Sequence, residues 1–132
     1  MDGDRQEKLE EALRTLLEKT QDIDAAAIVG LDGFVMASVL PPGYEADRLG
    51  AMSAALLSLG ERTAIELGRG ELAQVFVEGT QGYVFLLAAG VDAVLTAIVR
   101  RGGKLGLVLS DIRNAAKSIA AIIESYLQVE YE

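Results

Sequence analysis

Residues 45–68, EADRLGAMSAALLSLGERTAIELG, are the stretch of sequence that decides the fold. The segment reads as one helix, and its portion from Leu49 to Gly60 contains no charged residue. A helix that covers a core from one side carries an apolar stripe and a charged face, and here the charged face is missing for about three turns. We therefore expect one face of this helix to pack on its own domain and another face to meet a second surface.

Small residues along the helix favour a second helix as that surface. Ala, Ser and Gly recur between positions 51 and 60, which would let a neighbouring helix come close. A helix over residues 45–68 is about 36 Å long, and a chain of 132 residues cannot surround it. We expect a homodimer joined along this helix, and the alternative is a monomer with a buried core helix.

The composition limits the class of protein. The chain has 132 residues, is 51% hydrophobic and carries a net charge of −8, which fits one folded domain over residues 1–132. Its N-terminus is acidic where a signal peptide is basic, and no apolar run has the length of a membrane span, so a cytoplasmic protein without membrane insertion is expected. The negative charge repels nucleic-acid phosphates, so no nucleic-acid partner is expected.

No motif in the sequence predicts catalysis or a bound cofactor. The chain contains no His and no Cys, which removes disulfides, zinc sites of the Cys/His kind and histidine acid–base chemistry. Gly102-Gly103-Lys104 opens the last predicted helix, but Leu105 stands where a P-loop requires Ser or Thr. We expect a protein that is not an enzyme and needs no cofactor or metal.

The remaining elements alternate between helices and short apolar strands. Helices are predicted over residues 5–19 and 104–128, and strands over residues 25–31, 34–40, 72–78, 83–89 and 93–100. Asp32-Gly33 separates the first two strands and predicts a hairpin with a type I′ turn. The last three strands are joined by short Gly-rich connections, which require antiparallel neighbours.

Three strands indicate how many layers cover the sheet. Residues 25–31, 83–89 and 93–99 are apolar at nearly every position. Strands with one face in water alternate between polar and apolar residues, whereas strands covered on both faces do not. We therefore expect an α/β protein with an antiparallel sheet between helices, in the order helix, two strands, long helix, three strands, helix.

Several segments resemble the roadblock (dynein light chain) family. Residues 30–38, GLDGFVMAS, resemble the first hairpin of that family. The segments that resemble its bacterial branch are residues 61–64 (ERTA), 66–72 (ELGRGEL) and 77–79 (VEG), and residues 105–108 (LGLV) resemble the start of its last helix. The similarity spans about residues 5–127.

This resemblance implies a profilin-like α/β/α sandwich with a five-stranded antiparallel sheet. Family members dimerise by pairing their third strands and laying their long helices side by side, which corresponds here to residues 72–78 and 46–67. They have no catalysis of their own and bind small Ras-like GTPases, as regulators in bacterial polarity and gliding systems or as adaptors. The bacterial polarity member is a GTPase-activating protein that supplies no arginine finger.

These expectations assign two sets of residues. The dimer interface is expected to contain Leu49, Met52, Ser53, Leu56, Gly60, Thr63, Leu72, Gln74, Phe76 and Glu78. The contact with a small Ras-like GTPase is expected at the charged ends of the long helix, at Arg48, Glu61, Arg62 and Glu66. Arg62 is the best single contact, and the alternative is an ordinary surface arginine paired with Glu66 at i+4.

Other interpretations stay open at this point. The strand over residues 72–78 is either a solvent-exposed edge or the strand that pairs with its copy in a second subunit. The protein could instead be a small-molecule sensor of profilin-like architecture, which a large interior pocket with converging polar groups would favour. A third alternative is a passive scaffold subunit without regulatory effect.

Overall fold

A computed structural model describes residues 2–131, so Met1 and Glu132 of the predicted domain lie outside the described residues. The helices are α1 (Asp2–Lys19), α2 (Ala46–Glu66) and α3 (Leu105–Tyr131). The strands are β1 (Ile23–Gly30), β2 (Val35–Val39), β3 (Gln74–Gly79), β4 (Gly82–Ala88) and β5 (Ala93–Arg100). The order of the elements is the predicted one.

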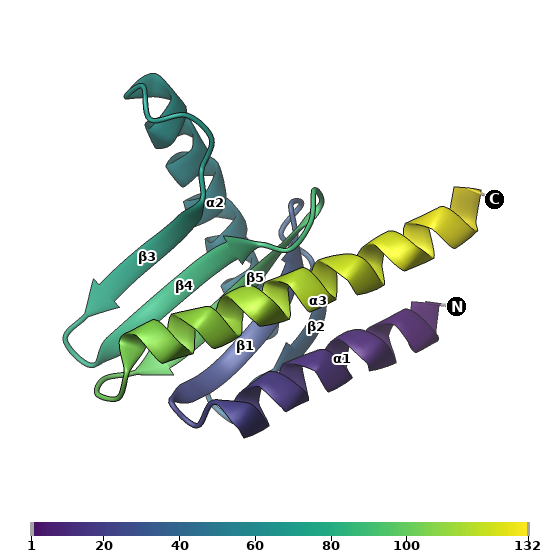
Figure 1. Cartoon of the computed structure of the whole chain (residues 1–132), viewed down its shortest axis with the longest axis horizontal. Helices are drawn as coiled ribbons and strands as arrows, with labels where there is room; N and C mark the ends of the chain where they lie inside the picture. Colours follow the sequence, from purple (N-terminus) through teal and green to yellow (C-terminus); the bar gives the residue numbers. More distant parts are fainter. Residues whose placement is uncertain (1, 132) are drawn as a thin grey trace.

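All five strands form one antiparallel sheet with the order β2-β1-β5-β4-β3. The central strand β5 pairs with β1 on one side and β4 on the other, and β2 and β3 are the edges. Figure 1 shows α1 and α3 on one face of the sheet and α2 on the opposite face. This layered arrangement confirms the sandwich that was predicted from strands in which polar and apolar residues do not alternate.

The core is divided by the sheet into two unequal parts. The larger part lies under α1 and α3, and its fully buried side chains include Leu9, Leu13, Phe85, Ile112 and Ile119. The part under α2 consists of two small clusters, one around Leu49 and one around Leu57. The larger cluster of buried side chains therefore lies on the α1 and α3 side of the sheet.

The β1–β2 hairpin is present, but the predicted type I′ turn is wrong. A type I′ turn requires a positive φ at both central residues. Gly33 has a φ of 89°, but no described residue other than glycine has a positive φ, so Asp32 does not meet the requirement. Gly33 N–H donates to the Gly30 carbonyl at 2.9 Å, and Gly30 N–H donates to the Phe34 carbonyl at 2.8 Å. Asp32 keeps a negative φ while its carboxylate accepts the Phe34 N–H at 3.0 Å. Three residues thus close the hairpin, with glycine only at the left-handed position.

Helix α2 is bounded by glycine at one end and held close to the sheet by glycine at two points. A Cβ on Gly50 would collide with the Gly33 carbonyl, and a Cβ on Gly60 would lie 2.9 Å from a methyl group of Val75. The helix ends at Glu66, and Gly68, two residues later, has a φ of 71° and closes the helix with the C-terminal motif that left-handed glycines provide. The two contact glycines allow α2 to approach β2 and β3 directly.

A polar contact ties the start of α1 to the last turns of α3. The Tyr126 hydroxyl donates to the Asp4 carboxylate at 2.5 Å, and the Lys8 ammonium lies 5.6 Å from the centre of the Tyr126 ring. The hydrogen bond to Asp4, followed by desolvation, raises the pKa of Tyr126 above its ordinary value.

None of the helices within residues 2–131 combines the length and apolar character required to cross a bilayer.

Candidate protein-interaction surface

The outer face of α2 is apolar and uncovered. Met52, Ala55 and Leu59 follow one another at i, i+3 and i+7, so they lie along one side of the helix, and all three are exposed. Leu59 is 63% exposed. We call these three residues the α2 stripe. An exposed apolar stripe of this kind makes this side of α2 a candidate interaction surface.

Other residues expected at the dimer interface face the sheet of their own protomer. Leu49 packs with Ala27 and Val29, and Ser53 is buried beneath α2. Leu56 is half-buried beside Leu57. These side chains fix α2 on its own sheet, and a second subunit could reach them only through the groove beside the helix.

That groove has a volume of about 350 Å³ and runs between the first half of α2 and the sheet. Its lining is mostly apolar and includes Tyr44, Arg48, Met52, Leu56, Val77, Val84 and Ile98. Arg48 pairs with Glu45 at 4.0 Å near one end. Among the residues that the structure describes, no buried side-chain nitrogen or oxygen lacks a hydrogen-bond partner. The groove therefore suits apolar side chains better than a polar small molecule.

Strand β3 offers a second uncovered feature beside α2. It pairs only with β4, so one side of its backbone faces outward at the sheet edge. Phe76 and Val77 are exposed on opposite faces of this strand. Leu72, just before the strand, packs with the cluster around Leu57.

The side chains of β3 on the α3 face are held by neighbours. The Phe76 ring stacks on Tyr83 and contacts Phe85, with ring centres 5.5 and 4.9 Å apart. Gln74 accepts a hydrogen bond from Arg113 at 3.3 Å, and Glu78 accepts one from Arg101 at 3.2 Å. These contacts hold the edge strand in place without using the outward side of its backbone.

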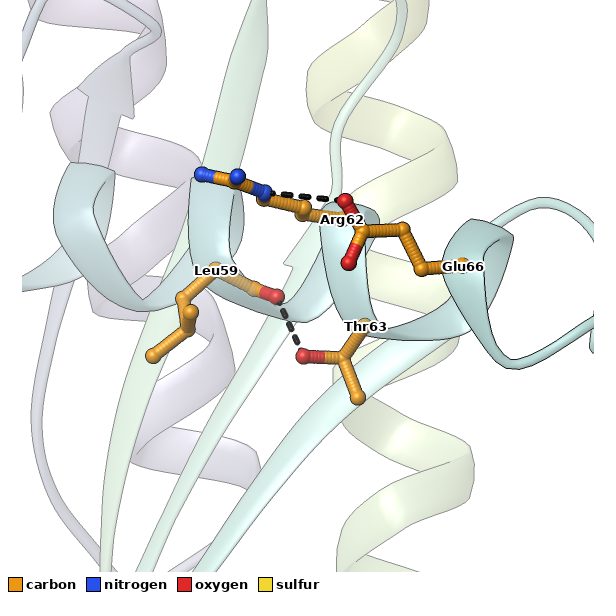
Figure 2. Close-up of polar contacts among 4 residues, drawn as sticks. All are labelled: Leu59, Arg62, Thr63 and Glu66. Atoms are coloured by element: carbon orange, nitrogen blue, oxygen red, sulfur yellow. Dashed lines mark hydrogen bonds and ion pairs between the residues drawn. The ribbon is translucent and has the colours of Figure 1, made fainter.

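The charged residues expected to contact a GTPase occupy both ends of α2. Figure 2 shows that Arg62 and Glu66 lie side by side at the C-terminal end, with Arg62 Nε and Glu66 Oε1 3.1 Å apart. Thr63 folds back on its own helix, because its hydroxyl donates to the Leu59 carbonyl at 2.7 Å. Glu61 is exposed on the same end.

These charged residues do not converge on a single site. Arg48 precedes Arg62 by four helical turns, a separation of about 21 Å along the axis at 1.5 Å per residue. The Arg62–Glu66 pair is the i+4 pair that the alternative interpretation anticipates. A partner that contacts both ends would have to span most of α2.

Two apolar residues beside this pair were missed by sequence reasoning. Ile65 and Leu67 are both exposed at the C-terminal end of α2. They lie outside the uncharged segment, among charged residues, so the composition of the helix did not single them out. The end of α2 therefore combines apolar side chains with the Arg62–Glu66 pair, as protein-binding surfaces often do.

Among the residues that the structure describes, no group of three or more His, Cys, Asp or Glu side chains is placed to hold a metal ion. The exposed features on or beside α2 and β3 are a stripe, a groove, a strand edge and a charged helix end. Features of this kind suit protein partners, because they offer apolar area and backbone groups rather than reactive side chains.

The Roadblock/LC7 domain family matches residues 9–99 of the chain. The chain belongs to the Roadblock/LC7 family. It is 39% identical over 111 residues to MJ1340, an uncharacterized protein of Methanocaldococcus jannaschii, and the match covers 83% of this chain and 96% of that protein. The family predicted from the hairpin and helix segments is thereby confirmed.

Solved structures show the same fold. MglB of Myxococcus xanthus matches this Roadblock/LC7 protein with a TM-score of 0.82 at 23% identity, covering 89% of each chain. Profilin II of Acanthamoeba castellanii matches with a TM-score of 0.63 at 19% identity, covering 86% of this chain and 97% of that one. The predicted profilin-like sandwich is confirmed, and the similarity to MglB agrees with the expected bacterial branch at the level of fold.

Proposed function

We propose that this Roadblock/LC7 protein is a single-domain, non-catalytic homodimer that binds a small Ras-like GTPase in the cytoplasm and regulates or tethers it. The observation that carries the proposal is the position of the α2 stripe next to the open edge of β3. One partner could cover the α2 stripe and the β3 edge together, provided that it offers a complementary helix and strand edge.

A second copy of the chain offers such a helix and strand edge. When a strand pairs with its own copy across a two-fold axis, the two strands are antiparallel, so β3 can extend the five-stranded sheet into the partner's sheet. The same rotation brings the two α2 helices to the same face of the joined sheet. Apolar side chains of the partner's stripe could then enter the groove beside α2.

The C-terminal end of α2 is the part that we assign to the GTPase. Arg62, Glu66 and Leu67 are exposed there and are not used by the core. The net charge of −8 favours a partner with a basic patch, and such attraction raises the association rate at low salt. Glu61, exposed next to Arg62, belongs to this surface, whereas Arg48 lies at the other end of α2 and would be reached only by a partner that spans the helix.

Regulation without catalysis requires a difference in affinity between nucleotide states. A protein that binds the GTP-bound and GDP-bound forms equally shifts neither state, whereas one that prefers a state stabilises it. The chain has no His or Cys to act on the nucleotide. In this proposal Arg62 stays on the protein surface with Glu66 and orients the partner.

Titration calorimetry of the dimer with a small GTPase from the same cell tests the proposal. The GTPase is loaded with GDP in one series and with a non-hydrolysable GTP analogue in another. We expect binding with a clear preference for one nucleotide. Equal binding of both forms would support the passive scaffold, and no binding of any such GTPase would overturn the GTPase assignment.

A further inference from the structure

Three large apolar side chains are exposed together at one end of the sheet, away from the α2 stripe. They are Leu31 (51% exposed), Phe34 (74%) and Val91 (90%). Leu31 and Phe34 belong to the β1–β2 turn, and Val91 belongs to the β4–β5 turn. We call these three residues the turn patch.

The two turns are neighbours because of the strand register. Gly30, the last residue of β1, pairs with Ala93, the first residue of β5. The Leu31 N–H donates to the Asp92 carbonyl at 3.3 Å, which joins the turns directly. Figure 1 shows both turns at the end of the sheet opposite the β3–β4 turn. The turn patch is therefore one surface formed by residues distant in sequence.

Leu31 lies between two hollows in this surface. On one side it lines an open depression of about 660 Å³ together with Phe34 and Asp92. On the other side it lines a narrow cleft of about 60 Å³ together with Val91 and Glu61. An apolar side chain from a partner can rest against Leu31 and reach Phe34 on one side or Val91 on the other.

Carboxylates surround the turn patch. Asp32 and Asp92 flank it within the turns, and Glu61 of α2 lies at the far side of the cleft. One cation, Arg5, lines the outer part of the depression. The excess of negative charge favours a basic partner. The same local carboxylates would face their own copies if a second chain bound through this patch, and that repulsion opposes self-association here.

We propose that the turn patch binds a segment of another protein in which an apolar anchor is flanked by Lys or Arg. This surface goes beyond the proposed dimer and GTPase contacts, because its three apolar residues lie in turns at the end of the sheet, outside the α2 stripe and β3, and it shares only the neighbouring Glu61 with the proposed GTPase contact. It would give each subunit a second contact for a protein partner, beside the contact on α2.

A peptide series tests this assignment on the intact protein. The probe is a short fluorescent peptide with two leucines flanked on each side by two lysines. One control peptide carries glutamates in place of the lysines, and a second carries serines in place of the leucines. Binding is measured by fluorescence anisotropy, and the site is mapped from amide chemical shifts of isotope-labelled protein.

We expect the lysine–leucine peptide to bind and to shift amides at residues 31–34 and 90–92. Both control peptides should bind at least about tenfold more weakly, and salt should weaken the binding of the probe. The double variant Phe34→Ser with Val91→Ser should lose about tenfold in affinity. Leu107→Ser, which removes a 61% exposed leucine at the opposite end of the sheet, should retain it.

The assignment is overturned by any of three results. These are equal binding of the glutamate peptide, chemical-shift changes that map to α2 or β3 instead of the turns, and an affinity that is unchanged in the double variant. Proton spectra of the variants check that their folds are intact. A failure here would leave the GTPase proposal standing, because that proposal rests on α2.

Discussion

The hydroxyl of Thr96, in the central strand β5, donates a 2.8 Å hydrogen bond to the hydroxyl of Ser53 in α2. Thr96 is 1% exposed and Ser53 is 2% exposed, so each hydroxyl depends on the other. The pair joins the long helix to the middle of the sheet. It is the polar contact by which the sheet positions α2 and the stripe on its outer face.

Substitutions at this pair should be strongly coupled. Ser53→Ala leaves the buried Thr96 hydroxyl without its partner and should lower the free energy of unfolding by about 1–3 kcal/mol. The double variant Ser53→Ala with Thr96→Val removes both hydroxyls and should recover much of that loss. Urea unfolding of the two single variants and the double variant measures the coupling, and additive losses would contradict the account.

Two glycines should respond in opposite directions to alanine. Gly50→Ala places a methyl group against the Gly33 carbonyl and should destabilise the protein by about 1–3 kcal/mol, because backbone must move. Gly106→Ala, in the first turn of α3, meets nothing within 4 Å and should stabilise it by about 0.5 kcal/mol. Thermal unfolding compares the two variants, and an unchanged Tm for Gly50→Ala would show that α2 does not lie this close to the hairpin.

A charge on the α2 stripe should separate the proposed dimer. Leu59→Asp puts an unpaired carboxylate into the interface, and losing a partner for a buried charge costs about 3–5 kcal/mol. Sedimentation equilibrium should give a dimer for the unmodified 14.0 kDa chain and a monomer for this variant. Leu107→Asp is the matched control, since Leu107 is similarly exposed but lies in α3. A dimer that survives Leu59→Asp would place the interface elsewhere.

Arg62 should matter for binding and hardly at all for folding. Its ion pair with Glu66 is exposed, and exposed pairs contribute about 0.2–1 kcal/mol. Arg62→Glu should therefore leave the urea midpoint nearly unchanged and the dimer intact while weakening the GTPase complex. Lys117→Glu, an exposed substitution on α3, serves as a control for the change in net charge. Equal effects of the two variants on binding would remove Arg62 from the contact.

The strands and the layering could be predicted because they depend on local patterns. β5 has the predicted bounds, and its unbroken apolar run requires cover on both faces. The turn at Gly33 was predicted with the wrong geometry, since the Asp32 side chain stabilises a three-residue loop that the dipeptide alone does not specify. The pattern identifies the hairpin, and the local hydrogen bonds determine its turn.

The division of α2 into an inner and an outer face could not be predicted from its residues. Met52 is apolar and exposed, whereas Ser53 is polar and buried, because Thr96 lies opposite Ser53 and supplies its partner. In a segment without charges the usual contrast between faces is absent, so periodicity gives little guidance. The exposed Leu31 and Val91 were missed for a related reason, because the register of β1 and β5 brings their turns together.

The central claim is that a homodimer of this chain distinguishes the nucleotide states of a small Ras-like GTPase. The most direct measurement is the dissociation constant of the intact dimer for such a GTPase from the same cell, determined once with GDP and once with a non-hydrolysable GTP analogue. The account predicts constants that differ by at least about fivefold, a coupling of about 1 kcal/mol. Equal constants, or no binding in either state, would contradict it.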